Sequence, residues 1–276
     1  MLINDHFQNF KGYQIPPAQL VIADIPYNIG INAFASNPSW YIDGDNKNGE
    51  SENARKSFFA TDENFKPAEF MHFCSRLMKK EPKKTNDAPC MIVFCSYEQQ
   101  FYLIELARKY GINNYINLVF RKNFSAQVLK ANMRVVGNAE YGLLLYREKL
   151  PKFNNNGKMI FNVMDWEDDK DILYEKIHPT QKPVKLLEKL ISIFTDEGDV
   201  VIDPVAGSGS TLVAADNLNR KSYGFEINKQ FYKDANNWIE KCKKVRTEIN
   251  TNGFSKTLMQ SQSKNQLLFQ FSEVTK

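Results

Sequence analysis

Apolar and polar positions along the chain predict an alternation of strands and helices. Several short runs are almost entirely apolar and often β-branched, which is typical of strands buried on both faces of a parallel sheet. The predicted strands are 20–23, 88–95, 114–121, 199–203 and 221–226, with 140–147 as a further candidate. Between them, apolar residues recur at helical spacing and predict amphipathic helices. The predicted helices are 67–80, 97–110, 184–194 and 212–218.

This alternation predicts an α/β fold in which helices cover both faces of a doubly wound, mostly parallel sheet. A length of 276 residues suits one large α/β domain with an insertion. We expect this domain to span 1–246. The remaining residues, 247–276, are rich in polar side chains and predict a flexible tail.

Composition and charge are those of an ordinary globular protein. Hydrophobic residues make up 42% of the chain and charged residues 25%. The chain has no apolar run long enough for a membrane span and no signal-peptide pattern at its start, so we expect a cytoplasmic protein. The four cysteines lack zinc-binding spacing, which predicts reduced thiols in the core and no metal site. A net charge of +4 permits a polyanionic partner but does not require one.

The sequence Asp24-Ile25-Pro26-Tyr27 directly follows the first predicted strand. In open α/β sheets, ligands bind where the parallel strands end. The Asp24 carboxylate and the backbone carbonyl of Ile25 or Pro26 can each accept a hydrogen bond, and Tyr27 offers a flat apolar face. Two acceptors beside a ring suit a planar substrate that carries an amino group, such as a nucleobase. The alternative is a simple turn after the strand.

A glycine-rich turn, Asp203-Pro204-Val205-Ala206-Gly207-Ser208-Gly209, follows a later predicted strand. A Walker phosphate loop is excluded because it requires a lysine, and the dinucleotide fingerprint GxGxxG is incomplete. A nucleoside without phosphates fits better, because glycines let the backbone approach a ligand closely. The next predicted strand ends at Glu226, where an acid can accept hydrogen bonds from both ribose hydroxyls.

The segment His178-Pro179-Thr180-Gln181-Lys182-Pro183 leads directly into the predicted helix 184–194. A helix N-terminus attracts anions such as carboxylates, and Lys182 adds to that attraction. The alternative is an ordinary helix start, in which Thr180 caps nearby amides.

Two polar regions separate these motifs. Residues 28–66 predict either a mobile loop that orders on its ligand or an insertion without a role. Residues 121–177 combine positive charge with aromatic and amide side chains, as on a nucleic-acid surface, although a solvated face with core aromatics is the alternative. The basic residues considered for this surface are Arg121, Lys122, Lys130, Arg134, Arg147, Lys149, Lys152 and Lys158.

Together, the motifs resemble those of the β-class amino-methyltransferases of DNA. That family carries Asp/Ser/Asn-Pro-Pro-Tyr/Phe near the N-terminus and His-Pro-Thr-Gln-Lys-Pro in its second half, followed by Asp-Pro-Phe-x-Gly-x-Gly and a Gly-x-Glu strand. This chain has corresponding segments in the same permuted order, at 24–27, 178–183, 203–209 and 224–226. It departs at Ile25, where the family has proline, and at Val205, where the family has an aromatic residue.

The resemblance implies a Rossmann-like methyltransferase fold with a small target-recognition region within 121–177. It also implies S-adenosylmethionine as the cofactor. The residues implied to bind this cofactor are Asp5, Thr180, Lys182, Asp203, Pro204, Gly207, Ser208, Gly209, Phe225 and Glu226. The residues implied to act in catalysis are Asp24, Ile25, Pro26 and Tyr27.

The resemblance further implies site-specific methylation of double-stranded DNA on the amino group of a base that has left the duplex. The leading aspartate favours adenine N6, with cytosine N4, RNA or protein glutamine as alternative targets and an inactive DNA-binding module as a further alternative. The resemblance leaves a homodimer and a partner restriction enzyme open, and it implies a bacterial or phage-encoded protein. In the tail, Gln266-Leu267-Leu268-Phe269 resembles a peptide that binds the bacterial sliding clamp.

Overall fold

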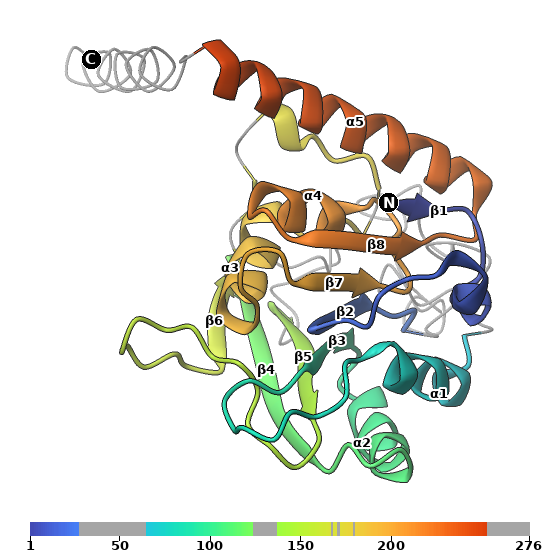
Figure 1. Ribbon diagram of the computed structural model, residues 1–276, viewed down its shortest axis with the longest axis vertical. Helices are drawn as coiled ribbons and strands as arrows, with labels where there is room; N and C mark the ends of the chain where they lie inside the picture. Colours follow the sequence, from blue (N-terminus) through green and yellow to red (C-terminus); the bar gives the residue numbers. More distant parts are fainter. Residues whose placement is uncertain (28–64, 124–136, 167, 170–171, 179, 253–276) are drawn as a thin grey trace, which may run out of the picture.

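The computed structural model describes residues 1–27, 65–123, 137–166, 168–169, 172–178 and 180–252. Within these residues, eight strands form one sheet in the order β1-β8-β7-β2-β3-β5-β4-β6 (Figure 1). The strands are β1 (Leu2–Ile3), β2 (Leu20–Asp24), β3 (Cys90–Cys95), β4 (Asn114–Lys122), β5 (Ala139–Tyr146), β6 (Val163–Trp166), β7 (Val200–Asp203) and β8 (Lys221–Phe225). Strand β5 is antiparallel to both of its neighbours, whereas all other neighbouring pairs are parallel. The prediction of a mostly parallel α/β sheet is therefore confirmed.

Helices cover both faces of the sheet. One face carries the 3-10 helix η1 (Phe7–Tyr13), α1 (Pro67–Leu77) and α2 (Gln99–Lys109). The other face carries α3 (Val184–Phe194), α4 (Ser210–Asn217) and α5 (Lys229–Asn252), with the short 3-10 helix η6 (Ile172–Tyr174) beside them. The sheet therefore lies between two hydrophobic cores.

The central strand β2 explains why its sequence is apolar at successive positions. Leu20 and Ile22 belong to the core beneath α3 and α4, whereas Val21 and Ala23 belong to the core beneath α1. All four side chains are completely buried. Successive side chains of a strand point to opposite faces, so a strand that is covered on both sides has no polar alternate position.

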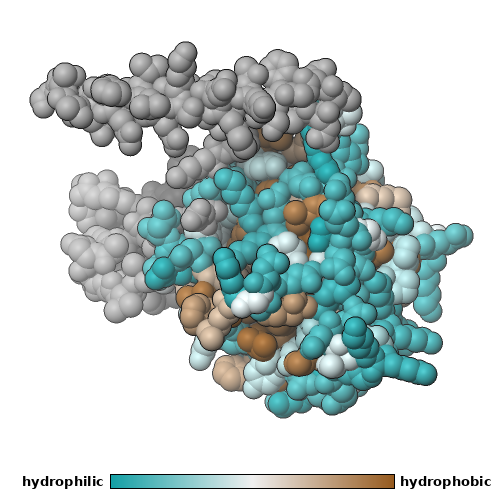
Figure 2. Space-filling model, turned by 60° about the vertical axis from the view of Figure 1, so that its left-hand side comes forward, coloured by the Kyte–Doolittle hydropathy of each residue, from teal (hydrophilic) through white to brown (hydrophobic). Residues whose placement is uncertain are grey.

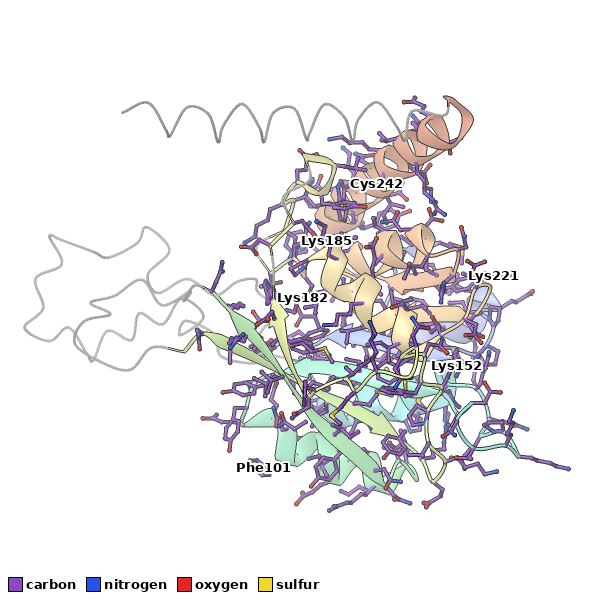
Figure 3. The ribbon with its side chains drawn as sticks, turned by 90° about the vertical axis from the view of Figure 1, so that its left-hand side faces the viewer. Phe101, Lys152, Lys182, Lys185, Lys221 and Cys242 are labelled. Carbon is purple, nitrogen blue, oxygen red and sulfur yellow. The ribbon has the colours of Figure 1, made fainter. Side chains whose placement is uncertain are left out.

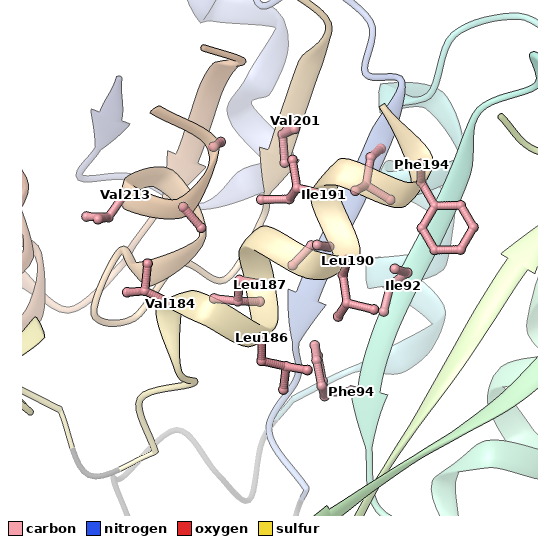
Figure 4. Close-up of a cluster of buried hydrophobic side chains, with 14 of the residues drawn as sticks. Ile92, Phe94, Val184, Leu186, Leu187, Leu190, Ile191, Phe194, Val201 and Val213 are labelled. Carbon is pink, nitrogen blue, oxygen red and sulfur yellow. The ribbon is translucent and has the colours of Figure 1, made fainter. Parts of the chain in front are cut away.

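Helix α3 shows how the larger core is packed (Figure 4). Its residues Leu187, Leu190 and Ile191 lie in one buried cluster with Ile92 of β3 and Val201 of β7. The observed bounds of α3 coincide with the predicted helix 184–194. The 3.6-residue spacing of its apolar positions is therefore a reliable signal of the face that α3 buries.

The start of α3 is capped differently from the sequence-based expectation. The Asp169 carboxylate accepts hydrogen bonds from the backbone N–H groups of Val184, at 2.7 Å, and Lys185, at 3.3 Å. The Thr180 hydroxyl lies 3.2 Å from His178 Nδ1 instead. The alternative in which Thr180 caps this helix is therefore wrong, because an acid from the preceding loop already occupies the helix N-terminus.

Two further expectations concern the end of the chain and the long loop. Helix α5 continues to Asn252, past residue 247, where the sequence predicts that the flexible tail begins. The peptide 266–269 and most of the predicted loop 28–66 lie outside the described residues. Their proposed roles stay predictions.

The surface and the cysteines agree with the composition. The face shown in Figure 2 is mainly hydrophilic. Within the described part of the chain, every helix is too short or too polar to cross a membrane. Cys74, Cys90, Cys95 and Cys242 are buried free thiols, which confirms their predicted place in the core.

The strand order places a topological switch point between β2 and β7. From β2 the chain continues to β3 on one side, whereas β7 leads to β8 on the other side. Ligands of open α/β sheets bind outside the carboxyl ends of the strands at such a point. These ends carry Asp24 on β2, Asp203 on β7 and Phe225 on β8. Motifs from opposite ends of the sequence therefore meet at one edge of the sheet.

Candidate active site

A cavity of about 390 Å³ lies at this edge of the sheet. Residues of every predicted motif line it. The predicted residues in its wall are Asp24, Pro26, Thr180, Lys182, Asp203, Pro204, Gly207, Ser208, Phe225 and Glu226. The predicted residues outside its wall are Asp5, Ile25, Tyr27 and Gly209. The catalytic motif at the end of β2 and the last third of the chain thus contribute to a single site.

Asp24 ends strand β2 and presents its two carboxylate oxygens to different environments. Oδ2 accepts a hydrogen bond from Lys182 Nζ at 2.6 Å. Oδ1 is buried and has no hydrogen-bond partner among the residues that the structure describes. Burial raises the pKa of Asp24 to about 6, although the nearby Lys182 ammonium lowers it. At neutral pH, Asp24 is therefore mainly ionised and keeps one acceptor oxygen available.

The backbone after Asp24 is held by β3 and by α2. The Ile25 N–H donates to the Phe94 carbonyl at 3.2 Å, and the Ile25 side chain is buried. The Gln99 side-chain amide donates to the Pro26 carbonyl at 2.9 Å. The sequence left two carbonyls open as the second acceptor beside Asp24. Of these two, the carbonyl of Pro26 already has a protein partner.

Lys182 is directed to protein carboxylates and lies at the edge of the sheet (Figure 3). Its Nζ is 2.6 Å from Asp24 Oδ2 and 3.2 Å from Glu140 Oε2. Burial lowers the pKa of Lys182, but the charges of Asp24 and Glu140 outweigh this effect and raise it. The resemblance implied that Lys182 lies near a cofactor carboxylate. In the structure its ammonium is instead engaged by Asp24 and Glu140.

The glycine-rich turn is joined to the end of β8 through Glu226. Gly207 has a φ of +51°, a left-handed conformation that favours glycine, and its N–H donates to Glu226 Oε2 at 2.9 Å. The Asn228 N–H donates to Glu226 Oε1 at 2.7 Å. Burial raises the pKa of Glu226, although these backbone hydrogen bonds lower it. Both oxygens of this carboxylate therefore accept backbone donors while the side chain lines the cavity wall.

Asp203 adds another buried carboxylate to the cavity wall. Its Oδ1 accepts a hydrogen bond from the Val205 N–H at 3.1 Å. The pKa of Asp203 is raised to about 7, mainly by burial and also by the charges of Asp24 and Glu226, although the hydrogen bonds that it accepts lower it. Asp24, Asp203 and Glu226 thus face one space, which favours a positively charged ligand.

Gly209 and Asp5 serve the fold rather than the cavity wall. Gly209 has a φ of +76°, and a Cβ atom at this position would lie 2.8 Å from Ile239 Cδ1. Its lack of a side chain therefore lets α4 pack against α5. The Asp5 carboxylate accepts hydrogen bonds from Asn9 Nδ2 at 2.8 Å and from the Tyr13 hydroxyl at 2.7 Å, and so holds η1.

Some residues of the cavity wall were not assigned from the sequence. His178 is buried, and burial lowers its pKa to about 4, with the Lys182 charge lowering it further, so its ring is neutral at neutral pH. Its ring centroid lies 4.4 Å from that of Phe231, at the start of α5. His178 belonged to a recognised motif and could have been assigned from it. Phe231 belongs to none of the recognised motifs, so the sequence carried no signal for its place in the cavity wall.

Five of the basic residues considered for a nucleic-acid surface at 121–177 are divided between the two edges of the sheet. Arg121 and Lys122 end β4 at the edge of Asp24, where they pair with Asp165 and Glu140. Strand β5 is antiparallel to β3. The residues that follow the end of β5 therefore lie at the sheet edge opposite to Asp24.

Arg147, Lys149 and Lys152 lie at that opposite edge and bind protein groups. Arg147 donates to the Ser75 carbonyl at 2.9 Å, and Lys149 Nζ donates to the Pro82 carbonyl at 2.7 Å. Lys152 forms ion pairs whose partners are Asp87, Asp196 and Asp199. The interpretation of 121–177 as one basic surface is therefore wrong for these three residues. Lys130 and Arg134 lie outside the described residues.

Comparisons with known proteins point to one family. The model of N6/N4 methyltransferases, described as DNA methylase, matches residues 18–237. The Type II methyltransferase M2.DpnII of Streptococcus pneumoniae is 40% identical over 98 residues, which are 34% of this chain and 36% of that protein. The DNA adenine methyltransferase YhdJ of Escherichia coli K12 is 33% identical over 138 residues, which are 50% of this chain and 42% of that protein. The matching regions thus span less than half of the length of either relative.

Solved structures share the fold. The crystal structure of the M1.HpyAVI-SAM complex aligns with a TM-score of 0.60 and 24% identity, over 86% of this chain and 98% of that chain. The cytosine-N4-specific PvuII DNA methyltransferase aligns with a TM-score of 0.57 and 14% identity, over 90% of this chain and 91% of that chain. At such identities the similarity concerns the fold alone. Because the family model covers most of the sequence, this chain belongs to the N6/N4 DNA methylase family.

Proposed function

We propose that this protein transfers a methyl group from S-adenosylmethionine to the exocyclic amino group of a base in double-stranded DNA, with adenine N6 as the expected target. One observation carries the proposal: the Asp24 carboxylate and the Gly207 turn line the same cavity. Membership of the DNA methylase family supports it. The relative YhdJ, whose name is DNA adenine methyltransferase, supports the choice of adenine.

The cavity fits S-adenosylmethionine on chemical grounds. This molecule carries a sulfonium and an ammonium group, and the cavity presents the carboxylates of Asp24, Asp203 and Glu226. We propose that Asp203 and Ser208 hold its methionine part. Both Glu226 oxygens accept backbone donors, and we propose that the carboxylate also accepts the ribose hydroxyls. Phe225 offers apolar surface to the adenine ring.

The catalytic step depends on acceptors for the target amine. The lone pair of an aromatic exocyclic amine is delocalised into its ring, so the amine is a poor nucleophile. Asp24 Oδ1 and the Ile25 carbonyl accept its two N–H groups, draw the nitrogen toward a tetrahedral shape and make the lone pair available. S-adenosylmethionine, when bound, supplies a methyl group whose bond to sulfur breaks, with the electron pair kept by sulfur, as the new C–N bond forms. Asp24 then accepts the proton that the cationic nitrogen loses.

Access to Asp24 requires that the target base leave the duplex. The Asp24 side chain is only 24% exposed and lies in a concave wall, which stacked base pairs cannot enter. Tyr27 lies three residues after this acid and is the expected stacking partner for the flipped base. The target-recognition role of 121–177 and the sliding-clamp peptide 266–269 stay predictions.

Tritium transfer from labelled S-adenosylmethionine tests the proposal. The purified protein is incubated with double-stranded DNA, with RNA and with protein, and the labelled product is digested and identified. We expect the label in DNA, as N6-methyladenine. The Asp24→Ala variant is the matched control and should transfer far less label. If the labelled product is N4-methylcytosine, the proposed target base is cytosine rather than adenine. Label confined to RNA or protein, or the absence of any transfer, would refute it.

A further inference from the structure

Four side chains of alternating charge lie in a row that begins in the cavity wall. Lys182 Nζ contacts Asp24 Oδ2 at 2.6 Å and Glu140 Oε2 at 3.2 Å, and the Lys122 ammonium pairs with Glu140 Oε1. The exposed fractions of the side chains are 7% for Lys182, 12% for Lys122 and 18% for Glu140. The motifs account for Asp24 and Lys182. They assign no role to Glu140 or Lys122.

The sheet fixes this row of charges. Glu140 lies opposite Phe120 in the antiparallel ladder of β5 and β4, which brings the start of β5 to the edge where β2 ends. The ammonium groups of Lys182 and Lys122 lie 5.5 and 4.6 Å from the Trp166 ring centroid. An aromatic face stabilises such cations and limits their movement. Three of the four groups therefore lie on strands of the sheet, and Lys182 lies beside the Trp166 ring.

The charges in the row sum to zero. Lys182 alone would neutralise Asp24, and it would also oppose the positive charge that a target nitrogen gains as it takes the methyl group. Glu140 offsets the Lys182 charge from the other side, and Lys122 in turn offsets Glu140. Water screens these interactions weakly because the groups are largely buried, so each charge affects its neighbours strongly.

We propose, on the basis of the proposed function, that Glu140 is a positioning residue that holds Lys182 on Asp24 Oδ2 and shares its charge, so that Oδ1 stays a strong acceptor for the target amine. Oδ1 is the oxygen that is buried without a hydrogen-bond partner among the described residues. Glu140 does not line the cavity, so it acts through Lys182. The charged or titratable groups that face Asp24 are Lys182, Glu140, Lys122, Asp203 and Cys95.

The variants Glu140→Gln and Lys182→Met test this role through the pH dependence of methyl transfer. Glu140 raises the pKa of Asp24, whereas Lys182 lowers it. The acidic limb of the single-turnover rate should therefore move to lower pH in Glu140→Gln and to higher pH in Lys182→Met. At neutral pH, Glu140→Gln should also lower the rate about 10- to 100-fold, the range found when groups that orient metal ligands are removed. Its affinity for S-adenosylmethionine should stay close to that of the wild type.

Two further variants serve as controls. Glu140→Asp keeps the negative charge and should recover part of the rate. Glu240→Gln removes a carboxylate that pairs with Lys243 on α5, far from the row, and should leave the rate and the pH profile unchanged. A lower rate in Glu140→Gln with an unmoved acidic limb would mean a merely structural role and would overturn the proposal. An unchanged rate would overturn it as well.

The test separates this inference from the proposed function. If the wild type methylates DNA but all variants have the same pH profile as the wild type, the role of Glu140 is contradicted and the proposed function is not. If the wild type methylates no DNA, the proposed function fails, and NMR titration of the Asp24 carboxyl carbon, assigned with Asp24→Asn, tests the row directly. Opposite shifts of this titration in Glu140→Gln and Lys182→Met support the row. Equal titrations in these variants overturn it.

Discussion

The Gly207 N–H donates a 2.9 Å hydrogen bond to the Glu226 carboxylate, so the glycine-rich turn and the end of β8 are joined without any ligand. The other carboxylate oxygen accepts the Asn228 N–H at 2.7 Å. Glu226 therefore shapes the cavity wall in addition to its proposed contact with the ribose hydroxyls. Mutation can separate these two roles.

Replacement of Glu226 by alanine should lower both stability and cofactor affinity. The backbone amides of Gly207 and Asn228 would lose their acceptor, which should reduce the free energy of unfolding by about 1–3 kcal/mol. Glu226→Gln keeps one acceptor oxygen, so it should cost less stability but still weaken S-adenosylmethionine binding. Urea unfolding and calorimetric titration measure the two effects. Unchanged affinity in both variants would contradict the ribose contact.

Replacement of Asp24 by alanine should strongly slow methyl transfer while cofactor binding persists. The variant loses the acceptor for the target amine, and we expect the single-turnover rate to fall about 10²- to 10³-fold. The affinity for S-adenosylmethionine should change little, because Asp203 and Glu226 remain in the cavity wall. Asp24→Asn keeps one acceptor oxygen and should retain more activity than the alanine variant. Near wild-type turnover in Asp24→Ala would remove Asp24 from the mechanism.

The sequence was sufficient to place the residues that end strands. Asp24 and Asp203 each follow a short apolar run, and the carboxyl ends of parallel strands share one edge of a sheet. Their approach in one cavity thus follows from local pattern together with a general rule of topology. The helix 184–194 was equally accessible, because its apolar spacing reports a local property of the chain.

Contacts that depend on non-local pairing could not be predicted in this way. Glu140 meets Lys182 because β5 runs antiparallel between β3 and β4, and neither the direction nor the register of that strand is encoded in its own residues. The same direction reversal carries Arg147 away from the site. Gly209 shows a different limit, since the motif that contains it does not reveal that Ile239 packs over it.

The affinity for S-adenosylmethionine should rise as the pH rises through about 7. Burial raises the pKa of Asp203 to about 7, so this carboxyl gains its negative charge near neutral pH, and a cationic ligand favours the charged form. Binding should therefore release protons, which calorimetry in buffers of different ionisation enthalpy detects. Without ligand, the same group lowers the free energy of unfolding as the pH rises toward 7, because the folded state keeps a proton that the unfolded state has lost.

Asp203→Asn is the matched control for this pH dependence. The amide has a similar shape but does not titrate, so the variant should bind S-adenosylmethionine more weakly and with a flatter pH dependence. Proton release should fall in the same variant. An affinity that is constant or decreasing with pH in the wild type would contradict the role of the Asp203 charge.

Gly209→Ala should destabilise the protein without a direct effect on cofactor binding. The substitution combines an unfavourable φ of +76° with a Cβ atom 2.8 Å from Ile239 Cδ1, and we expect a loss of about 1–3 kcal/mol in the free energy of unfolding. Gly198→Ala is the matched control, because Gly198 has a φ of +80° and no atom within 4 Å of the added Cβ. It therefore measures the backbone strain alone.

A double variant tests the packing part of the Gly209 effect. Ile239→Val removes the Cδ1 atom that the new Cβ would meet, so Gly209→Ala should cost less in this background, with a coupling of about 0.5 kcal/mol or more. Denaturant unfolding of the four proteins in the cycle measures this coupling. If Gly209→Ala costs no more than Gly198→Ala, the packing explanation is wrong. If it weakens S-adenosylmethionine binding while stability is retained, Gly209 contributes to the cofactor site, as the motif alone implied.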